Sequence, residues 1–151
     1  MGQQQLLLII LGVIIVGIAI AVGITMFRDN SLSANKDAVI NDLAQLASKA
    51  QEYYRKPASL GGGGNSYVGL DSIGVLVSSE YSNNDNGRYF LIPFSPTQIG
   101  IAGFCKTQND DGTYPLIGLA VTPTGTTLGP WINTATEIPA TLGSGGSLSL
   151  N

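Results

Sequence analysis

The sequence predicts an α+β protein in which a long N-terminal helix, hydrophobic in its first half and amphipathic in its second, packs on a small antiparallel β-sheet. Three observations predict this fold. The stretch from Leu6 to Phe27 contains no charged side chain, and the segment behind it repeats apolar residues at helical spacing. From Ser66 onward, short runs of strand-forming residues alternate with turn signals. We therefore divide the chain into a hydrophobic helix, 1–28, and a domain, 29–151, that holds the helix continuation and the sheet.

The hydrophobic segment is long enough to cross a membrane, because a helix rises about 1.5 Å per residue and this stretch covers roughly 30 Å. Such a surface must be hidden in lipid, in a partner or in copies of itself. A cleaved signal peptide is not expected, since no basic residue precedes Arg28 and the apolar run is too long. The residues predicted to form this membrane or assembly helix are Gln5, Leu6, Leu7, Leu8, Ile9, Ile10, Leu11, Gly12, Ile14, Ile15, Ile18, Val22, Ile24 and Phe27.

The amphipathic half carries one apolar stripe, whose members are spaced alternately four and three residues apart: Val39, Leu43, Leu46, Ala50 and Tyr53. The stripe is shorter than three heptads and contains Ala at inward positions, which favours packing on a sheet over a coiled coil. Asp42 and Lys56 are assigned to other faces of the helix, with a Glu52–Lys56 ion pair, and Pro57 ends the helix. Whether the helix continues through the polar residues between the two halves is left open.

The β half is predicted from its turn signals. Residues 74–81 and 88–94 are expected to be strands on either side of an Asn/Gly-rich loop, and 99–107 and 113–122 to form a hairpin around Asp111-Gly112. Residues 128–138 form either an edge strand or an irregular return segment, and the low-complexity tail after them has no evident place in the core. Prolines cannot donate to a ladder, so edges, strand starts or turns are expected at Pro93, Pro96, Pro115 and Pro123.

Composition argues against several classes of function. The chain has no His, so an enzyme site is not expected. Its net charge is −3 and its seven basic residues are scattered along the sequence, so a nucleic-acid surface is not expected. No cofactor is expected either. The single cysteine, Cys105, excludes an intrachain disulfide and is interpreted as a small buried thiol, with an intermolecular bridge or a reactive thiol as alternatives.

Two oxygen-rich stretches, 83–86 and 109–111, could in principle supply ligands to Ca²⁺. Neither has the spacing of an EF-hand loop. Asn and Asp favour turns because their side chains bond to the nearby backbone, so turn chemistry is the preferred interpretation of both stretches. The Gly61–Gly64 run is interpreted as a flexible loop that leaves the helix, because no phosphate-binding signature accompanies it.

An apolar N-terminal helix, its amphipathic continuation, a glycine-rich loop and an antiparallel sheet, in this order, resemble the type IV pilin and pseudopilin superfamily. If Met1 is the mature first residue, MGQQQLLLIILGVIIVGIAIA aligns with the processed terminus of that family. The family usually carries Glu at the fifth mature position, where this chain has Gln5. If instead Gly2 ends a short leader, the fifth position is Leu7, so neither register restores the glutamate.

The resemblance implies a structural subunit that waits in the inner membrane and is then polymerised through its N-terminal helix into an extracellular filament. Its implied partners are copies of itself, the inner membrane before assembly and the pilus assembly machinery. Adhesion, motility, DNA uptake and secretion are the roles that such filaments serve, and no residue selects among them. The alternatives are a minor pseudopilin of a secretion or DNA-uptake system and a single-pass membrane protein with an extracytoplasmic binding domain.

Overall fold

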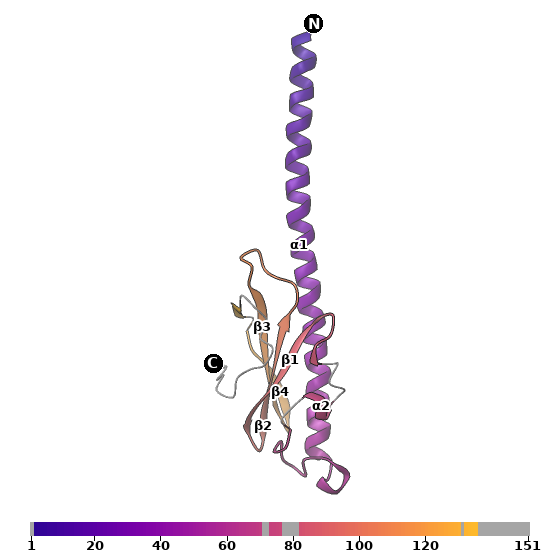
Figure 1. Ribbon diagram of the computed structural model, residues 1–151, viewed down its shortest axis with the longest axis vertical. Coiled ribbons are helices and arrows are strands. Elements are labelled where there is room, and N and C mark those ends of the chain that lie inside the picture. The colour runs from indigo at the N-terminus through magenta and orange to yellow at the C-terminus, as the bar shows by residue number, and fades with distance from the viewer. Residues whose placement is uncertain (1, 71–72, 77–81, 131, 136–151) are drawn as a thin grey trace. The chain divides into compact units, whose positions relative to one another are not determined.

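The structure, a computed structural model, describes residues 2–70, 73–76, 82–130 and 132–135 (Figure 1). Helix α1 spans Gly2–Arg55 without interruption, so the polar residues between its apolar and amphipathic halves are helical. The chain forms two compact units, Met1–Ala34 and Asn35–Asn151. The first unit is helix alone, and the second contains the remainder of α1 together with the sheet.

The end of α1 is closed by the glycine-rich loop. Pro57 follows the helix and leads into a short 3-10 helix, η1 (Ala58–Leu60). The loop then turns back, and the Gly63 backbone N–H donates to the Tyr53 carbonyl at 2.8 Å, which satisfies one of the last carbonyls of α1. A Cβ atom at Gly63 would collide with the Ser66 carbonyl oxygen. The glycines therefore serve close packing against the helix end, where the sequence predicts a flexible departure.

The sheet is antiparallel throughout the residues that the structure describes. Its strands follow the order β1-β2-β3-β4, and β5 pairs with the beginning of β3. The bounds are Gly87–Ser95 for β1, Gln98–Cys105 for β2, Tyr114–Thr122 for β3, Gly125–Leu128 for β4 and Ile132–Ala135 for β5. The predicted α+β fold, with one long N-terminal helix and an antiparallel sheet, is thus confirmed.

Of the six prolines in the β half, the four assigned to edges, strand starts or turns occupy the predicted kinds of position. Pro96 lies in the tight turn between β1 and β2, and Pro123 lies in the turn that joins β3 to β4. Pro93 is on β1, which stands at one end of the strand order, next to a register shift. Pro115 precedes Leu116, where the β2–β3 ladder has its last pair. A missing N–H is tolerated at each of these places.

One predicted strand is wrong and one strand was not foreseen. Within the expected strand 74–81, the described part belongs to a short helix, α2 (Ile73–Leu76), while 77–81 lie outside the described residues. A short apolar run does not distinguish strand from helix by periodicity, and one helical turn suffices to pack Leu76 against the core. Strand β4 was not predicted. For residues 128–138, where an edge strand and an irregular segment were the alternatives, the presence of β5 shows that part of this segment is a strand. The tail from residue 136 onward also lies outside the described residues.

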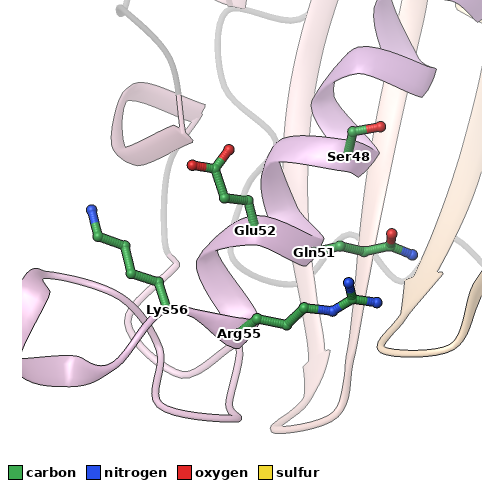
Figure 2. A pocket seen from close by; sticks show the side chains of 5 residues that line it. All are labelled: Ser48, Gln51, Glu52, Arg55 and Lys56. Carbon is green, nitrogen blue, oxygen red and sulfur yellow. The ribbon is translucent and has the colours of Figure 1, made fainter.

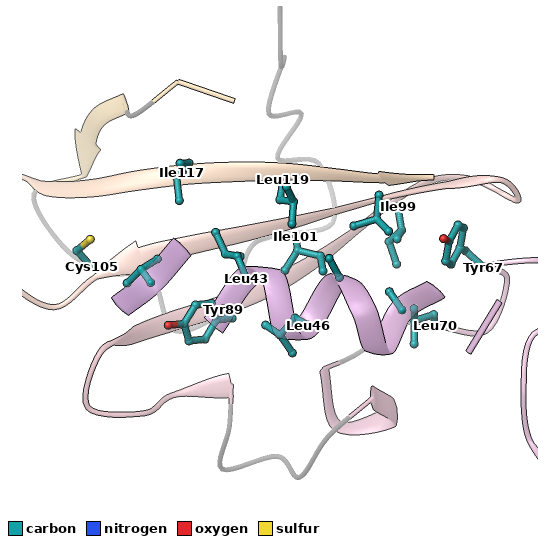
Figure 3. Close-up of a cluster of buried hydrophobic side chains, with 14 residues drawn as sticks. Leu43, Leu46, Tyr67, Leu70, Tyr89, Ile99, Ile101, Cys105, Ile117 and Leu119 are labelled. Atoms are coloured by element: carbon teal, nitrogen blue, oxygen red, sulfur yellow. The ribbon is translucent and has the colours of Figure 1, made fainter. Parts of the chain in front are cut away.

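The main core lies between α1 and one face of the sheet (Figure 3). Successive strand residues point to opposite faces, and the odd-numbered ones on β2 and β3 face the helix, among them Ile99, Ile101, Ile117 and Leu119. A second, smaller cluster contains Ala102, Phe104 and Leu116 from the alternate positions. The sheet therefore carries apolar side chains at both sets of positions.

Candidate functional site

The apolar segment of α1 presents its side chains to the outside. Every residue from Gly2 to Ser31 is exposed, and the exposed fractions of the large apolar side chains from Leu6 to Phe27 lie between 51% and 75%. The segment is long and apolar enough to cross a membrane. All fourteen residues predicted for the membrane or assembly helix, from Gln5 to Phe27, are exposed. Because exposed apolar surface costs about 25 cal/mol per Å² in water, this helix is compatible with membrane anchoring.

The glycines of the same segment leave room for a close neighbour. A Cβ atom built at Gly12, Gly17 or Gly23 would meet no heavy atom within 4 Å outside the local helix backbone. Small residues let helix backbones approach closely in lipid, where packing replaces the hydrophobic effect as the driving force. The three positions therefore allow close contacts with another helix.

The amphipathic half of α1 is attached to the sheet by its apolar stripe. Val39, Leu43, Leu46 and Ala50 are all 0% exposed, and the partly buried Tyr53 packs at the edge of the same cluster. The approach is close at Gly103 on β2, where a Cβ atom would lie 3.0 Å from Val39 Cγ1. Each fully buried aliphatic side chain contributes about 1.5–3 kcal/mol, so this stripe is the principal apolar attachment of the helix.

A buried carboxylate lies within that apolar contact. Asp42 on α1 is only 8% exposed, and its Oδ2 atom accepts hydrogen bonds from Tyr89 Oη at 2.6 Å, Asn84 Nδ2 at 2.9 Å and Asn86 Nδ2 at 3.0 Å. We call these four residues the Asp42 network. Hydrogen bonds to an ionised acceptor are about twice as strong as neutral ones. The network ties the helix to strand β1 and to the loop that precedes it.

The loop of the network is further ordered by its own side chains and by Asn35. Asn84 Oδ1 accepts from the backbone N–H groups of Asn86 at 3.0 Å and Gly87 at 2.9 Å. Asn35 lies on α1 about two helical turns before Asp42. It donates through Nδ2 to the Asn86 carbonyl at 2.8 Å and accepts from the Thr107 N–H at 3.3 Å. Asp42 and Asn35 of α1 thus both bind the loop that precedes β1. Asn35 also binds the segment that follows β2.

The sequence pattern missed this polar contact. The pattern places Asp42 on a face of the helix other than the apolar stripe, and this prediction is wrong, since the side chain is buried. Its position offered a usable signal: Asp42 follows Val39 by three residues and precedes Leu46 by four, so it lies within the apolar stripe. A buried carboxylate requires hydrogen-bond partners, and the asparagine-rich loop could have been considered as their source.

Comparison with known protein families, curated proteins and solved structures finds no match for this chain. Its architecture is an apolar N-terminal helix whose continuation packs on an antiparallel sheet. That arrangement is compatible with a pilin-like fold.

The other end of the docked helix carries polar contacts and a shallow hollow. Gln51 Nε2 donates to the Thr122 carbonyl at 3.1 Å, and Arg55 Nη2 lies 3.5 Å from the Pro123 carbonyl. The hollow is lined by polar side chains of the last turns of α1 and of the residue after it, namely Ser48, Gln51, Glu52, Arg55 and Lys56 (Figure 2). Glu52 pairs with Lys49 at 3.1 Å, where the sequence predicted a pair with Lys56.

In each of the two candidate calcium loops, a side-chain oxygen accepts hydrogen bonds from nearby residues. Asn84 Oδ1 accepts from the backbone N–H groups of Asn86 and Gly87. Asp111 Oδ1 accepts from the Thr113 hydroxyl at 2.6 Å and the Thr113 N–H at 3.0 Å. These two bonds lower the pKa of the Asp111 carboxyl. Among the residues that the structure describes, no group of three or more His, Cys, Asp or Glu could hold a metal ion.

Cys105 is buried at the end of β2, with none of its surface exposed. Burial raises the pKa of its thiol from 9.0 to about 12, against a smaller opposing effect of Lys36. The thiolate is the reactive form of cysteine, so a buried thiol with this pKa is unreactive near neutral pH. The interpretation as a small buried thiol is confirmed.

Proposed function

We propose that this chain is the structural subunit of a type IV pilus-like filament, anchored in a membrane before assembly by its apolar helix and polymerised through that helix afterwards. One observation carries the proposal. The segment from Leu6 to Phe27 is charge-free and exposed, and it continues without a break into a helix docked on a sheet. A subunit built this way can exchange lipid for the same segment of other copies.

The exchange places a physical demand on the helix surface. Lipid tails are as apolar as leucine, so leaving the membrane gains little from the hydrophobic effect. The filament must instead be favoured by close helix packing and by the assembly machinery. The open space around Gly12, Gly17 and Gly23 supports such packing, because neighbouring helices can approach their backbones there.

Gln5 distinguishes this chain from the usual pilin pattern. A charged residue inside an apolar bundle is costly unless it is paired, whereas an amide costs less and can still accept a hydrogen bond from a terminal amine. Gln5 favours a second candidate function for the same fold, a minor subunit that joins filaments made of another chain. It contributes no neutralising charge to a long polymer of its own.

Electron microscopy of material sheared from the surface of cells that produce this chain tests the proposal. Filaments whose main component by mass spectrometry is this chain are the expected result. Filaments that contain it only in trace amounts would assign it to the minor-subunit function. Complete retention in the membrane, with release by detergent as a monomer, would contradict both and leave a single-pass anchored protein.

A further inference from the structure

The chain contains one Asn-Gly dipeptide, Asn86-Gly87, at the entrance to strand β1. In this dipeptide the backbone nitrogen of glycine can attack the side-chain amide carbon of asparagine, because glycine has no Cβ atom to hinder the approach. The reaction forms a five-membered imide and releases ammonia, and water then opens the imide to aspartate or isoaspartate. The dipeptide is therefore a potential modification site in the middle of the Asp42 network.

In the folded chain both reacting groups are engaged in hydrogen bonds to other residues. The Asn86 side chain donates through Nδ2 to Asp42 at 3.0 Å, and the Gly87 N–H donates to Asn84 Oδ1 at 2.9 Å. Gly87 is also buried and paired with Cys105 in the β1–β2 ladder. Attack requires the Gly87 N–H to leave Asn84, and departure of the amide nitrogen requires Nδ2 to leave Asp42.

We propose that Asn86 is a deamidation site that the Asp42 network protects, and that its reaction makes opening of the network irreversible. The Gly87 nitrogen forms a bond to Asn86 Cγ, the Cγ–Nδ2 bond breaks, and the nitrogen leaves as ammonia after taking up a proton. Hydrolysis of the imide consumes one water molecule and leaves one carboxylate. In the aspartate product it stands where the amide donor stood, and in the isoaspartate product it forms at the former main-chain carbonyl carbon of Asn86. No oxidant or further reactant is needed.

The product cannot restore the network. In the aspartate product, the amide nitrogen that donates to Asp42 is replaced by a negatively charged oxygen, which would face the Asp42 carboxylate at hydrogen-bond distance in a buried site. Two adjacent carboxylates cannot both remain ionised in such surroundings without a large cost. The isoaspartate product also lengthens the main chain by one atom between Asn86 and Gly87, which shifts the start of β1. A chain whose Asp42 network opens and whose Asn86 then reacts therefore keeps a weakened attachment between α1 and the start of β1.

Peptide mass spectrometry of the full chain, incubated in detergent in warm, mildly alkaline buffer, tests the protection. The folded chain is expected to deamidate at Asn86 at least about tenfold more slowly than the same chain in urea, because reaction requires local opening. The Asp42→Asn variant, examined where near-ultraviolet circular dichroism shows it to be folded, is expected to react faster than the wild type. Equal rates in the folded and urea-unfolded wild type would overturn the proposal.

The substitution Asn86→Asp imitates the aspartate product and tests the irreversibility. It is expected to lower the folding equilibrium constant by about tenfold or more. The matched control is Asn83→Asp, which adds the same charge to the same loop at an exposed side chain and is expected to have little effect. If both variants unfold at the same urea concentration, the product is compatible with the network and the proposal fails. A complete failure of Asn86→Asp to fold, with Asn83→Asp folding normally, supports it.

Discussion

Replacing Asp42 by alanine is the sharpest test of how the helix is held on the sheet. The substitution removes the acceptor of three hydrogen bonds, from Tyr89, Asn84 and Asn86, at distances of 2.6, 2.9 and 3.0 Å. It leaves the apolar stripe of α1 unchanged. The effect therefore isolates the polar part of the attachment.

The expected cost follows from the burial of the three donors. Each hydrogen bond to an ionised group contributes about 1.5–3 kcal/mol, and a donor left unpaired in the interior costs about 1–3 kcal/mol. Tyr89 is 2% exposed, so its hydroxyl has little access to replacement water, whereas Asn84 and Asn86 are partly exposed and can recover solvent bonds. We expect Asp42→Ala to lower the free energy of unfolding by about 3–5 kcal/mol, a large part of the 5–15 kcal/mol typical of a domain.

Urea unfolding of the full chain in detergent, followed by near-ultraviolet circular dichroism, measures this cost because the signal reports the packed aromatic side chains. The matched control is Asp37→Ala, an exposed acid on the same helix, for which a change within about 0.5 kcal/mol is expected. Tyr89→Phe should cost about 1–2 kcal/mol, and the double variant should cost less than the sum of the two single changes. A cost below about 1 kcal/mol for Asp42→Ala would refute the reasoning.

Further predictions concern the apolar helix and the core. Ile14→Asp should abolish membrane insertion and assembly, at about 2.5–3.5 kcal/mol on insertion scales, whereas Ser33→Asp should leave filament yield unchanged; equal yields would contradict a buried helix. Gln5→Glu should preserve or increase filament yield if Met1 supplies the mature amine, and a strong loss would argue for another register. Tyr67 is buried, and its hydroxyl has no partner among the described residues, so Tyr67→Phe should leave the free energy of unfolding unchanged or raise it by about 1 kcal/mol; a clear loss would indicate a bonded hydroxyl. Because burial raises the pKa of Cys105 from 9.0 to about 12, the folded chain keeps a proton that the unfolded chain releases. Between pH 9 and 12, the free energy of unfolding should therefore fall by up to about 1.4 kcal/mol per pH unit relative to that of Cys105→Ala. If the free energies of unfolding of the wild type and of Cys105→Ala change with pH in parallel, the prediction is contradicted.

The parts of the fold that could be predicted from the sequence are those set by local pattern. The stripe from Val39 to Ala50 follows helical spacing because its burial requires one face. The four assigned prolines lie in turns, near a strand start or on an edge strand because they lack an N–H group. The Asp111-Gly112 signal correctly placed the turn between β2 and β3, where Gly112 has a φ of 77°. Each of these features is decided within a few residues.

The remaining features depend on distant neighbours. Residues Ile73–Leu76 form a helical turn because Leu76 can reach the core from it, which short-range periodicity does not reveal. Asp42 is buried because donors 42, 44 and 47 residues further along the chain converge on it. Such convergence is a property of the tertiary structure. For the apolar helix, the sequence predicts an exposed surface that must be covered, and it does not determine what covers it.

Oxidative cross-linking of cysteines placed in the apolar helix tests the central claim most directly, because the buried native Cys105 stays unreactive. Cysteine is introduced singly at Leu7, Ile10, Ile14 and Ile18, and then in pairs, and material sheared from the cells is examined. If helices of different copies pack together, some single variants form covalent dimers and some pairs form ladders of higher multimers. Monomers at every position, in sheared filaments that contain the chain as their main component, would contradict the account.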